Sequence, residues 1–117
     1  MTEARLTVNT SLVANLESLL GGPRDSALLR FGLANEYLKL GNYRAAALHF
    51  RKAIELDPQY SAAWKLLGRA LASQGESVAA LEAFRQGIVV ADKKGDKQAA
   101  KEMAVFVRRI ESAGNNQ

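Results

Sequence analysis

The sequence contains no cysteine, and it has only two prolines and one histidine among its 117 residues. Without cysteine the chain has no disulfide, no thiol nucleophile, no zinc–thiolate site and no iron–sulfur cluster. The single histidine, His49, is too little for a histidine-rich metal centre. We therefore expect no metal and no other cofactor.

Long apolar runs are also missing, so no stretch of the sequence is expected to span a membrane. The first ten residues, MTEARLTVNT, carry the acid Glu3 and lack the apolar core of a signal peptide. On this basis we expect a cytoplasmic location. The composition, 48% hydrophobic and 24% charged, is typical of an ordered globular domain and argues against a disordered chain.

The sequence matches itself at an offset of 34 residues. The matched pairs are Leu33 with Leu67, Gly41 with Gly75, Ala45 with Ala79, Ala46 with Ala80, Phe50 with Phe84, Arg51 with Arg85 and Ile54 with Ile88. A fixed period of this length is typical of stacked copies of one supersecondary unit.

Each copy is predicted to be a pair of helices. In the first copy, apolar residues recur at three- and four-residue steps up to Leu40, where Gly41-Asn42 breaks the pattern. A second apolar stripe follows and stops at Asp57-Pro58, because proline disfavours a helical residue before it. The second copy repeats the arrangement, with its break at Gly75-Glu76. Small residues are expected where helices come close, at Ala34, Ala46, Ala53, Gly68, Ala80 and Gly87.

These residues resemble the tetratricopeptide repeat (TPR) family, whose pattern is W-x2-L-G-x2-Y, then A-x3-F, then a small residue and a proline. The second copy carries Trp64, Leu67, Gly68, Leu71, Ala80, Phe84 and Gly87, and the first carries Leu33, Ala34, Tyr37, Ala46, Phe50, Ala53 and Pro58. The sequence departs from the pattern at Arg30 in the Trp slot, Leu71 in the Tyr slot and Asp92 in the Pro slot. The resemblance covers residues 27–94.

The fold that this resemblance implies is all-α, an α-α superhelix of about six helices in one domain, residues 1–117. Two repeats alone leave their end faces uncovered, so helices on either side are expected to cap them. We predict an N-terminal capping helix within residues 1–26, repeats at 27–60 and 61–94, a C-terminal capping helix at 95–113 and a frayed tail at 114–117. The N-terminal helix is placed at residues 10–20 with Asn9 or Thr10 as its cap, and Asp96 is expected to cap the C-terminal helix.

An enzymatic role is not indicated. His49 is expected to be a partly exposed residue of a second helix, and the serines do not form a G-x-S-x-G nucleophile motif. The segment Gly21-Gly22-Pro23-Arg24 lacks the spacing of a phosphate-binding loop. We therefore expect no catalysis and no small-molecule substrate.

A binding groove is the better candidate for function. The resemblance implies that the first helices of successive pairs line a concave surface, and it places seven residues there: Phe31, Asn35, Leu38, Lys65, Arg69, Lys101 and Arg108. Two readings of Phe31 stay open, since it either packs under the N-terminal helix or belongs to the binding surface. The cations are likewise either ligand-binding groups or ordinary solvated surface.

The predicted function is that of a protein-interaction module: an adaptor, a scaffold or a co-chaperone-like protein. Its partner is expected to be another protein that presents a peptide or a helix, with acidic side chains as one option. Two alternatives remain. Residues 92–109 hold six basic and three acidic side chains out of a net charge of +4 for the whole chain, which suggests nucleic-acid binding. The ends of a short array suggest self-association, and we expect a monomer or a weak homodimer.

Overall fold

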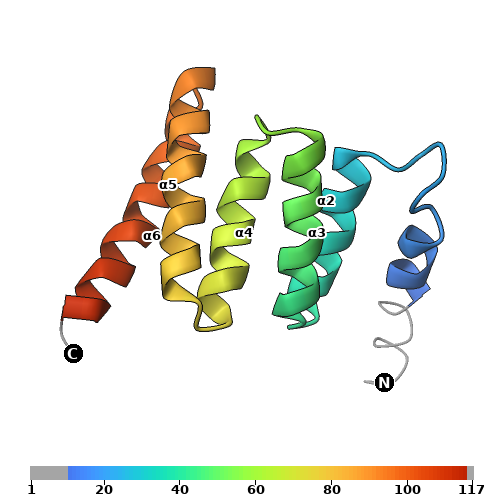
Figure 1. The fold of residues 1–117 in the computed structure, drawn as a ribbon, viewed down its shortest axis with the longest axis horizontal. Helices are drawn as coiled ribbons and strands as arrows, with labels where there is room; N and C mark the ends of the chain where they lie inside the picture. The colour runs from blue at the N-terminus through green and yellow to red at the C-terminus, as the bar shows by residue number, and fades with distance from the viewer. Residues whose placement is uncertain (1–10, 116–117) are drawn as a thin grey trace.

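The computed structural model describes residues 11–115, which form helices joined by short turns (Figure 1). A helical segment at residues 11–17 is followed by α2 (Ala27–Lys39), α3 (Tyr43–Leu56), α4 (Ser61–Ser73), α5 (Ser77–Lys94) and α6 (Lys97–Asn115). With no strand in this part of the chain, the prediction of an all-α repeat fold of six helices is confirmed. None of the described helices combines the length and the apolar character needed to cross a membrane.

Helices α2 to α6 lie in a row, and each packs on the next along the chain (Figure 1). The first helices of the pairs, α2, α4 and α6, also contact one another in sequence, α2 with α4 and α4 with α6. Among the described helices, α3 and α5 do not approach each other in this way. The face formed by α2, α4 and α6 is therefore the closer-packed one, and we call it the inner face. We call the face formed by α3 and α5 the outer face.

The turns between paired helices form at the predicted positions. Gly41 and Gly75 have φ of 77° and 81°, in the left-handed region that glycine adopts without strain. The next residue then donates its N–H back into the helix, from Asn42 to the carbonyl of Tyr37 and from Glu76 to that of Leu71, each at 2.9 Å. Both predicted helix breaks are thus confirmed.

Helix boundaries at the two ends of the chain differ from the prediction. The sequence predicts a first helix at residues 10–20, but the described helix ends at residue 17, and from Leu19 on the N–H groups bond three residues back instead of four. At the other end α6 runs to Asn115, two residues past its predicted end. The Asp96 cap is confirmed, since its carboxylate accepts from the N–H of Ala99 at 3.3 Å. The proposed caps Asn9 and Thr10 and the last two residues lie outside the described part.

The core contains the small residues that the repeat predicted at helix contacts. Ala34, Ala46, Ala53 and Ala80 are fully buried. At Gly68 of α4 an added Cβ would lie 2.5 to 2.7 Å from the ring of Phe84, which is closer than real Cβ atoms come to other atoms. At Gly87 of α5 it would meet the side chains of Met103 and Trp64. These glycines let α4, α5 and α6 approach closely.

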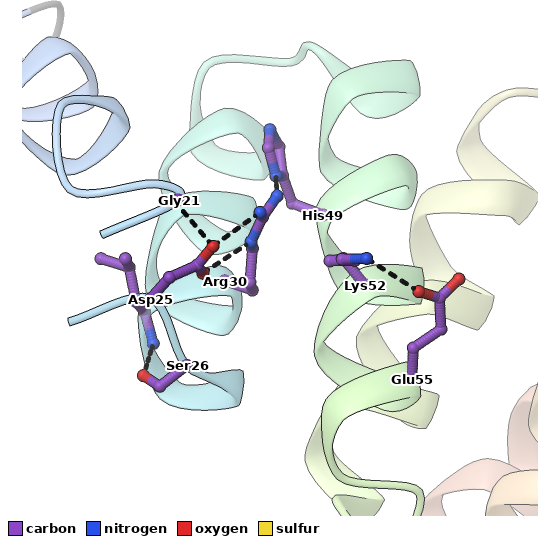
Figure 2. Close-up of polar contacts among 8 residues, drawn as sticks. Gly21, Asp25, Ser26, Arg30, His49, Lys52 and Glu55 are labelled. Carbon is purple, nitrogen blue, oxygen red and sulfur yellow. Dashed lines mark hydrogen bonds and ion pairs between the residues drawn. The ribbon is translucent and has the colours of Figure 1, made fainter. Parts of the chain in front are cut away.

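Arg30, the residue in the Trp slot of the first repeat, forms a polar cluster at the N-terminal edge of the array (Figure 2). Its Nε and Nη2 both donate to the carboxylate of Asp25, each at 2.9 Å, and Asp25 also accepts from the N–H of Gly21 at 2.9 Å. These bonds to the charged form lower the pKa of Asp25 to about 2, with the Arg30 guanidinium as the main cause. An ion pair thus ties the loop before α2 to that helix, where the family pattern has an aromatic residue.

The prediction that His49 is partly exposed is wrong. It is buried, with 8% of its surface accessible, and its ring stacks parallel to that of Tyr37 at 5.7 Å between centroids. Nη1 of Arg30 lies 3.5 Å from Nδ1 of His49 (Figure 2). Because a guanidinium only donates hydrogen bonds, this contact favours the neutral imidazole with an unprotonated Nδ1. Burial, and then the nearby Arg30 charge, lower the pKa of His49.

Replacing Gly68 with alanine is expected to destabilise the protein. The Phe84 ring is fully buried and would have to shift within the core, so we expect a loss of about 1–3 kcal/mol in the free energy of unfolding, measured with urea. Gly32 of α2 is the matched control, because its added Cβ would meet nothing within 4 Å. Gly32→Ala should stabilise the helix by about 0.5–1 kcal/mol. A Gly68→Ala protein as stable as wild type would contradict the packing described for α4.

Stability is expected to depend on pH through His49, the only histidine of the chain. The folded pKa lies below the ordinary value of 6.5, so the unfolded chain takes up the proton first as the pH falls. The free energy of unfolding should therefore be highest above about pH 7 and decline as the pH falls from about 7 to about 5. In His49→Gln the decline should be smaller. Parallel urea-unfolding profiles for the two proteins would show that His49 does not titrate as described.

Candidate functional site

The seven residues predicted for the groove all lie on the three helices of the inner face. Phe31, Asn35 and Leu38 are on α2, Lys65 and Arg69 are on α4, and Lys101 and Arg108 are on α6. The residues of α2 and Lys65 are half-buried, whereas Arg69, Lys101 and Arg108 are exposed. Because α4 contacts both α2 and α6, residues far apart in the sequence meet on this face.

Phe31 belongs to an aromatic cluster at the junction of the two repeats. Its ring stacks on Tyr60, with 4.7 Å between centroids, and meets Phe50 edge-on at 5.6 Å. Burial, and then the nearby Asp57 carboxylate, raise the pKa of Tyr60, so this phenol stays neutral at physiological pH. Tyr60 was not among the predicted site residues, because its contact with Phe31 depends on how the two repeats meet.

Lys65 pairs with a carboxylate that the sequence did not connect to it. Its Nζ lies 3.3 Å from Oε1 of Glu102 on α6, and the two side chains are 25% and 43% exposed. An ion pair this open to solvent contributes little to stability. An acidic group that approaches Lys65 would therefore compete with Glu102 for the Lys65 ammonium group.

Arg69 contacts Phe106, an aromatic residue of α6. The guanidinium carbon of Arg69 lies 5.7 Å from the centre of the Phe106 ring, and that of Arg109 lies 5.8 Å from it. Phe106 in turn stacks on Phe84, with 5.1 Å between centroids and 4° between the ring planes. Phe106 is half-buried: one face of its ring packs on the core, and the rest of the ring contacts the two arginines.

Lys101 and Arg108 complete the set of cations on the inner face. Both are exposed, and neither forms an ion pair with any residue between 11 and 115. With Arg69 and Arg109, they give the α4–α6 part of this face a positive surface. The α2 part offers the half-buried apolar surface of Phe31 and Leu38 beside it.

The outer face has a cleft that the sequence analysis did not foresee. Because α3 and α5 stay apart, α4 is visible between them, and a cavity of about 380 Å³ lies over Trp64 and Leu67 with Arg51 and Glu82 at its rim. Trp64 is fixed there by its indole N–H, which donates to the carbonyl of Pro58 at 2.9 Å. The cleft is lined by both a positive residue, Arg51, and a negative one, Glu82, so its lining favours neither anions nor cations.

The arrangement is suited to binding rather than to proton transfer. His49 is enclosed by Arg30 and Tyr37 and has no access to the inner face. Within the described residues, no three histidine or carboxylate side chains gather in a way that would hold a metal ion. What the inner face offers a ligand is apolar area, an amide and cations.

Comparison with known proteins agrees with this architecture. A family profile for the tetratricopeptide repeat matches residues 31–102. A TPR repeat-containing protein of Pseudomonas aeruginosa is 46% identical over 102 residues, which are 87% of this chain and 97% of the relative. A protein of Bordetella parapertussis with a known solution structure is 40% identical, with a TM-score of 0.76 and coverage of 86% of this chain and 88% of the other. The Sgt2 TPR domain of Aspergillus fumigatus is similar in fold, with a TM-score of 0.79 at 22% identity, over 99% of this chain and 76% of that domain.

Removing the carboxylate of Glu102 is expected to leave the fold intact. Because its pair with Lys65 is partly solvated, Glu102→Gln should change the free energy of unfolding by less than about 1 kcal/mol in urea. Glu111→Gln is the matched control, since Glu111 pairs with Arg85 across α5 and α6 in a similarly exposed setting. A loss of more than about 2 kcal/mol in Glu102→Gln alone would mean that the pair holds α4 and α6 together.

Proposed function

Since the chain belongs to the tetratricopeptide repeat family, we propose that it is a cytoplasmic protein-interaction module, an adaptor, scaffold or co-chaperone-like protein, that binds a peptide segment of a partner protein along its inner face. Domains of this family commonly mediate interactions between proteins. The partner is a protein and not a small molecule. No catalytic step and no cofactor enter this proposal.

The observation that carries the proposal is the division of the inner face into an apolar part and a cationic part. The half-buried surface of Phe31 and Leu38 can bury an apolar side chain, at about 25 cal/mol for each Å² removed from water. Lys101 and Arg69, on the neighbouring helices, can donate charge-assisted hydrogen bonds to carboxylates. A peptide lying across α2, α4 and α6 reaches both parts at once.

Nucleic-acid binding is less well supported by the same geometry. Proteins that bind single strands stack bases on exposed aromatic rings. Phe106, the aromatic residue of the basic segment, already has one face on Phe84 and two arginines around it. The acid Asp96 is used within the fold, where it accepts from Ser61 Oγ at 3.1 Å and caps α6.

Self-association is the other competing prediction. The last helix of the array, α6, carries the exposed cations Lys97, Lys101 and Arg108, and these like charges oppose the pairing of two copies through α6. We therefore favour a monomer, and sedimentation over a range of protein concentrations measures this directly.

Selection from a random peptide library finds ligands even before the partner has been identified. Twelve-residue peptides displayed on phage are selected on the folded protein and then titrated into isotope-labelled protein, with amide shifts followed by NMR. We expect the shifted amides to cluster on α2, α4 and α6. Lys65→Glu should weaken binding by about tenfold, because it reverses a charge at the centre of the face.

Lys52→Glu is the matched control, because Lys52 is also a lysine paired with a glutamate, Glu55, but lies on α3 (Figure 2). This variant should bind within about twofold of wild type. Selected peptides that shift amides of α3 and α5 instead would place the binding site in the outer cleft. Failure to select any peptide would contradict the proposed function itself.

A further inference from the structure

Arg69 and Arg109 come from different helices and converge on one aromatic ring. Their guanidinium carbons lie 5.7 and 5.8 Å from the centre of the Phe106 ring. One face of that ring is covered by the nearly parallel ring of Phe84. Both guanidinium groups therefore contact the part of Phe106 that Phe84 leaves free, although 40 positions separate the two arginines in the sequence.

Neither arginine has a carboxylate partner in the described part of the chain. The two acids of α6 that lie nearest in sequence are used elsewhere, Glu102 by Lys65 and Glu111 by Arg85. Two like charges that contact one aromatic ring repel each other, and the negative face of the ring offsets only part of this repulsion. An anion placed between the two guanidinium groups would remove the remainder.

We propose that Arg69, Arg109 and Phe106 form a subsite that binds the carboxylate of an aspartate or glutamate side chain of the partner peptide. This inference rests on the proposed function, and it specifies one chemical requirement of the ligand. Two planar guanidinium groups, both in cation–π contact with a ring that is itself packed against the core, can donate hydrogen bonds to the oxygens of one carboxylate. Because the residues belong to α4 and α6, the bound acid would bridge these two helices.

The choice of a protein carboxylate over a nucleic-acid phosphate follows from the ring. A base needs a free aromatic face to stack on, and Phe106 has none left. The apolar surface of Phe31 and Leu38 on the same inner face fits an amphipathic peptide better than a uniformly charged backbone. Binding of an oligonucleotide is therefore the opposing outcome of the test.

The test is a charge-specific double-mutant cycle on peptides selected against the wild-type protein. We expect every strongly binding peptide to carry at least one aspartate or glutamate, and its replacement by the matching amide to weaken binding by about tenfold. Arg69→Ala and Arg109→Ala should each weaken binding of the acidic peptide by about three- to tenfold. In the double variant the acidic and amide forms should bind alike, because the group that distinguishes them has been removed.

Arg44→Ala is the matched control, since Arg44 is an exposed arginine on α3 without an ion pair to a described residue, and it should bind like wild type. NMR spectra of each variant check that the fold is retained. Two results would overturn this subsite and leave the proposed function standing. One is a peptide that shifts inner-face amides but contains no aspartate or glutamate; the other is an acidic peptide whose affinity is unchanged in Arg69→Ala/Arg109→Ala. If no peptide can be selected, both fall. Tighter binding of a poly-uridylate oligonucleotide than of any acidic peptide, lost in the same double variant, would assign the arginines to phosphate instead.

Discussion

The contact between the Phe84 ring and the backbone of α4 is the constraint on which the rest of the structure depends. Only hydrogen at Gly68 leaves room for the ring, since any Cβ there would lie 2.5 Å from it. The same ring stacks on Phe106 of α6 at 5.1 Å. One buried side chain of α5 thereby sets the distance of both α4 and α6. The positions of Lys65 and Arg69 relative to Glu102 and Arg109, and with them the chemistry of the inner face, follow from this spacing.

The basic residues of this chain have different roles, which depend on the groups that they contact. Arg30 has a bidentate carboxylate partner in Asp25 and a neutral imidazole on its other side, so its hydrogen-bonding capacity is used within the fold. Arg69 and Arg109 have an aromatic ring but no acid among the described residues. An arginine of the first kind fastens a loop, and arginines of the second kind leave donors for a ligand. Net charge does not distinguish the two kinds.

Much of the fold was predictable, and the failures have physical causes. The breaks at Gly41 and Gly75 depend on a backbone conformation that glycine adopts most easily, so the local sequence indicates them. The helix of His49 was predicted but its burial was not, because a histidine beside Phe50 has no local signal of burial and its partners Arg30 and Tyr37 come from another helix. Likewise Phe31 had two open readings, and its stacking on Tyr60 depends on how the two repeats meet. Of the candidate site, the residue positions were predicted but their partners were not.

By itself the sequence determined that this chain is a stack of helix pairs, because the spacing of apolar residues, small residues and helix-breaking glycines recurs with one period. Those signals act over a few residues, and each repeat carries its own copy of them. Only the tertiary structure decided which cations of the inner face are already engaged. Lys65 and Glu102 stand 37 residues apart, and Arg69 reaches Phe106 from another helix. Such contacts depend on the distance between helices, which the packing of buried rings against glycine sets and which no local pattern records.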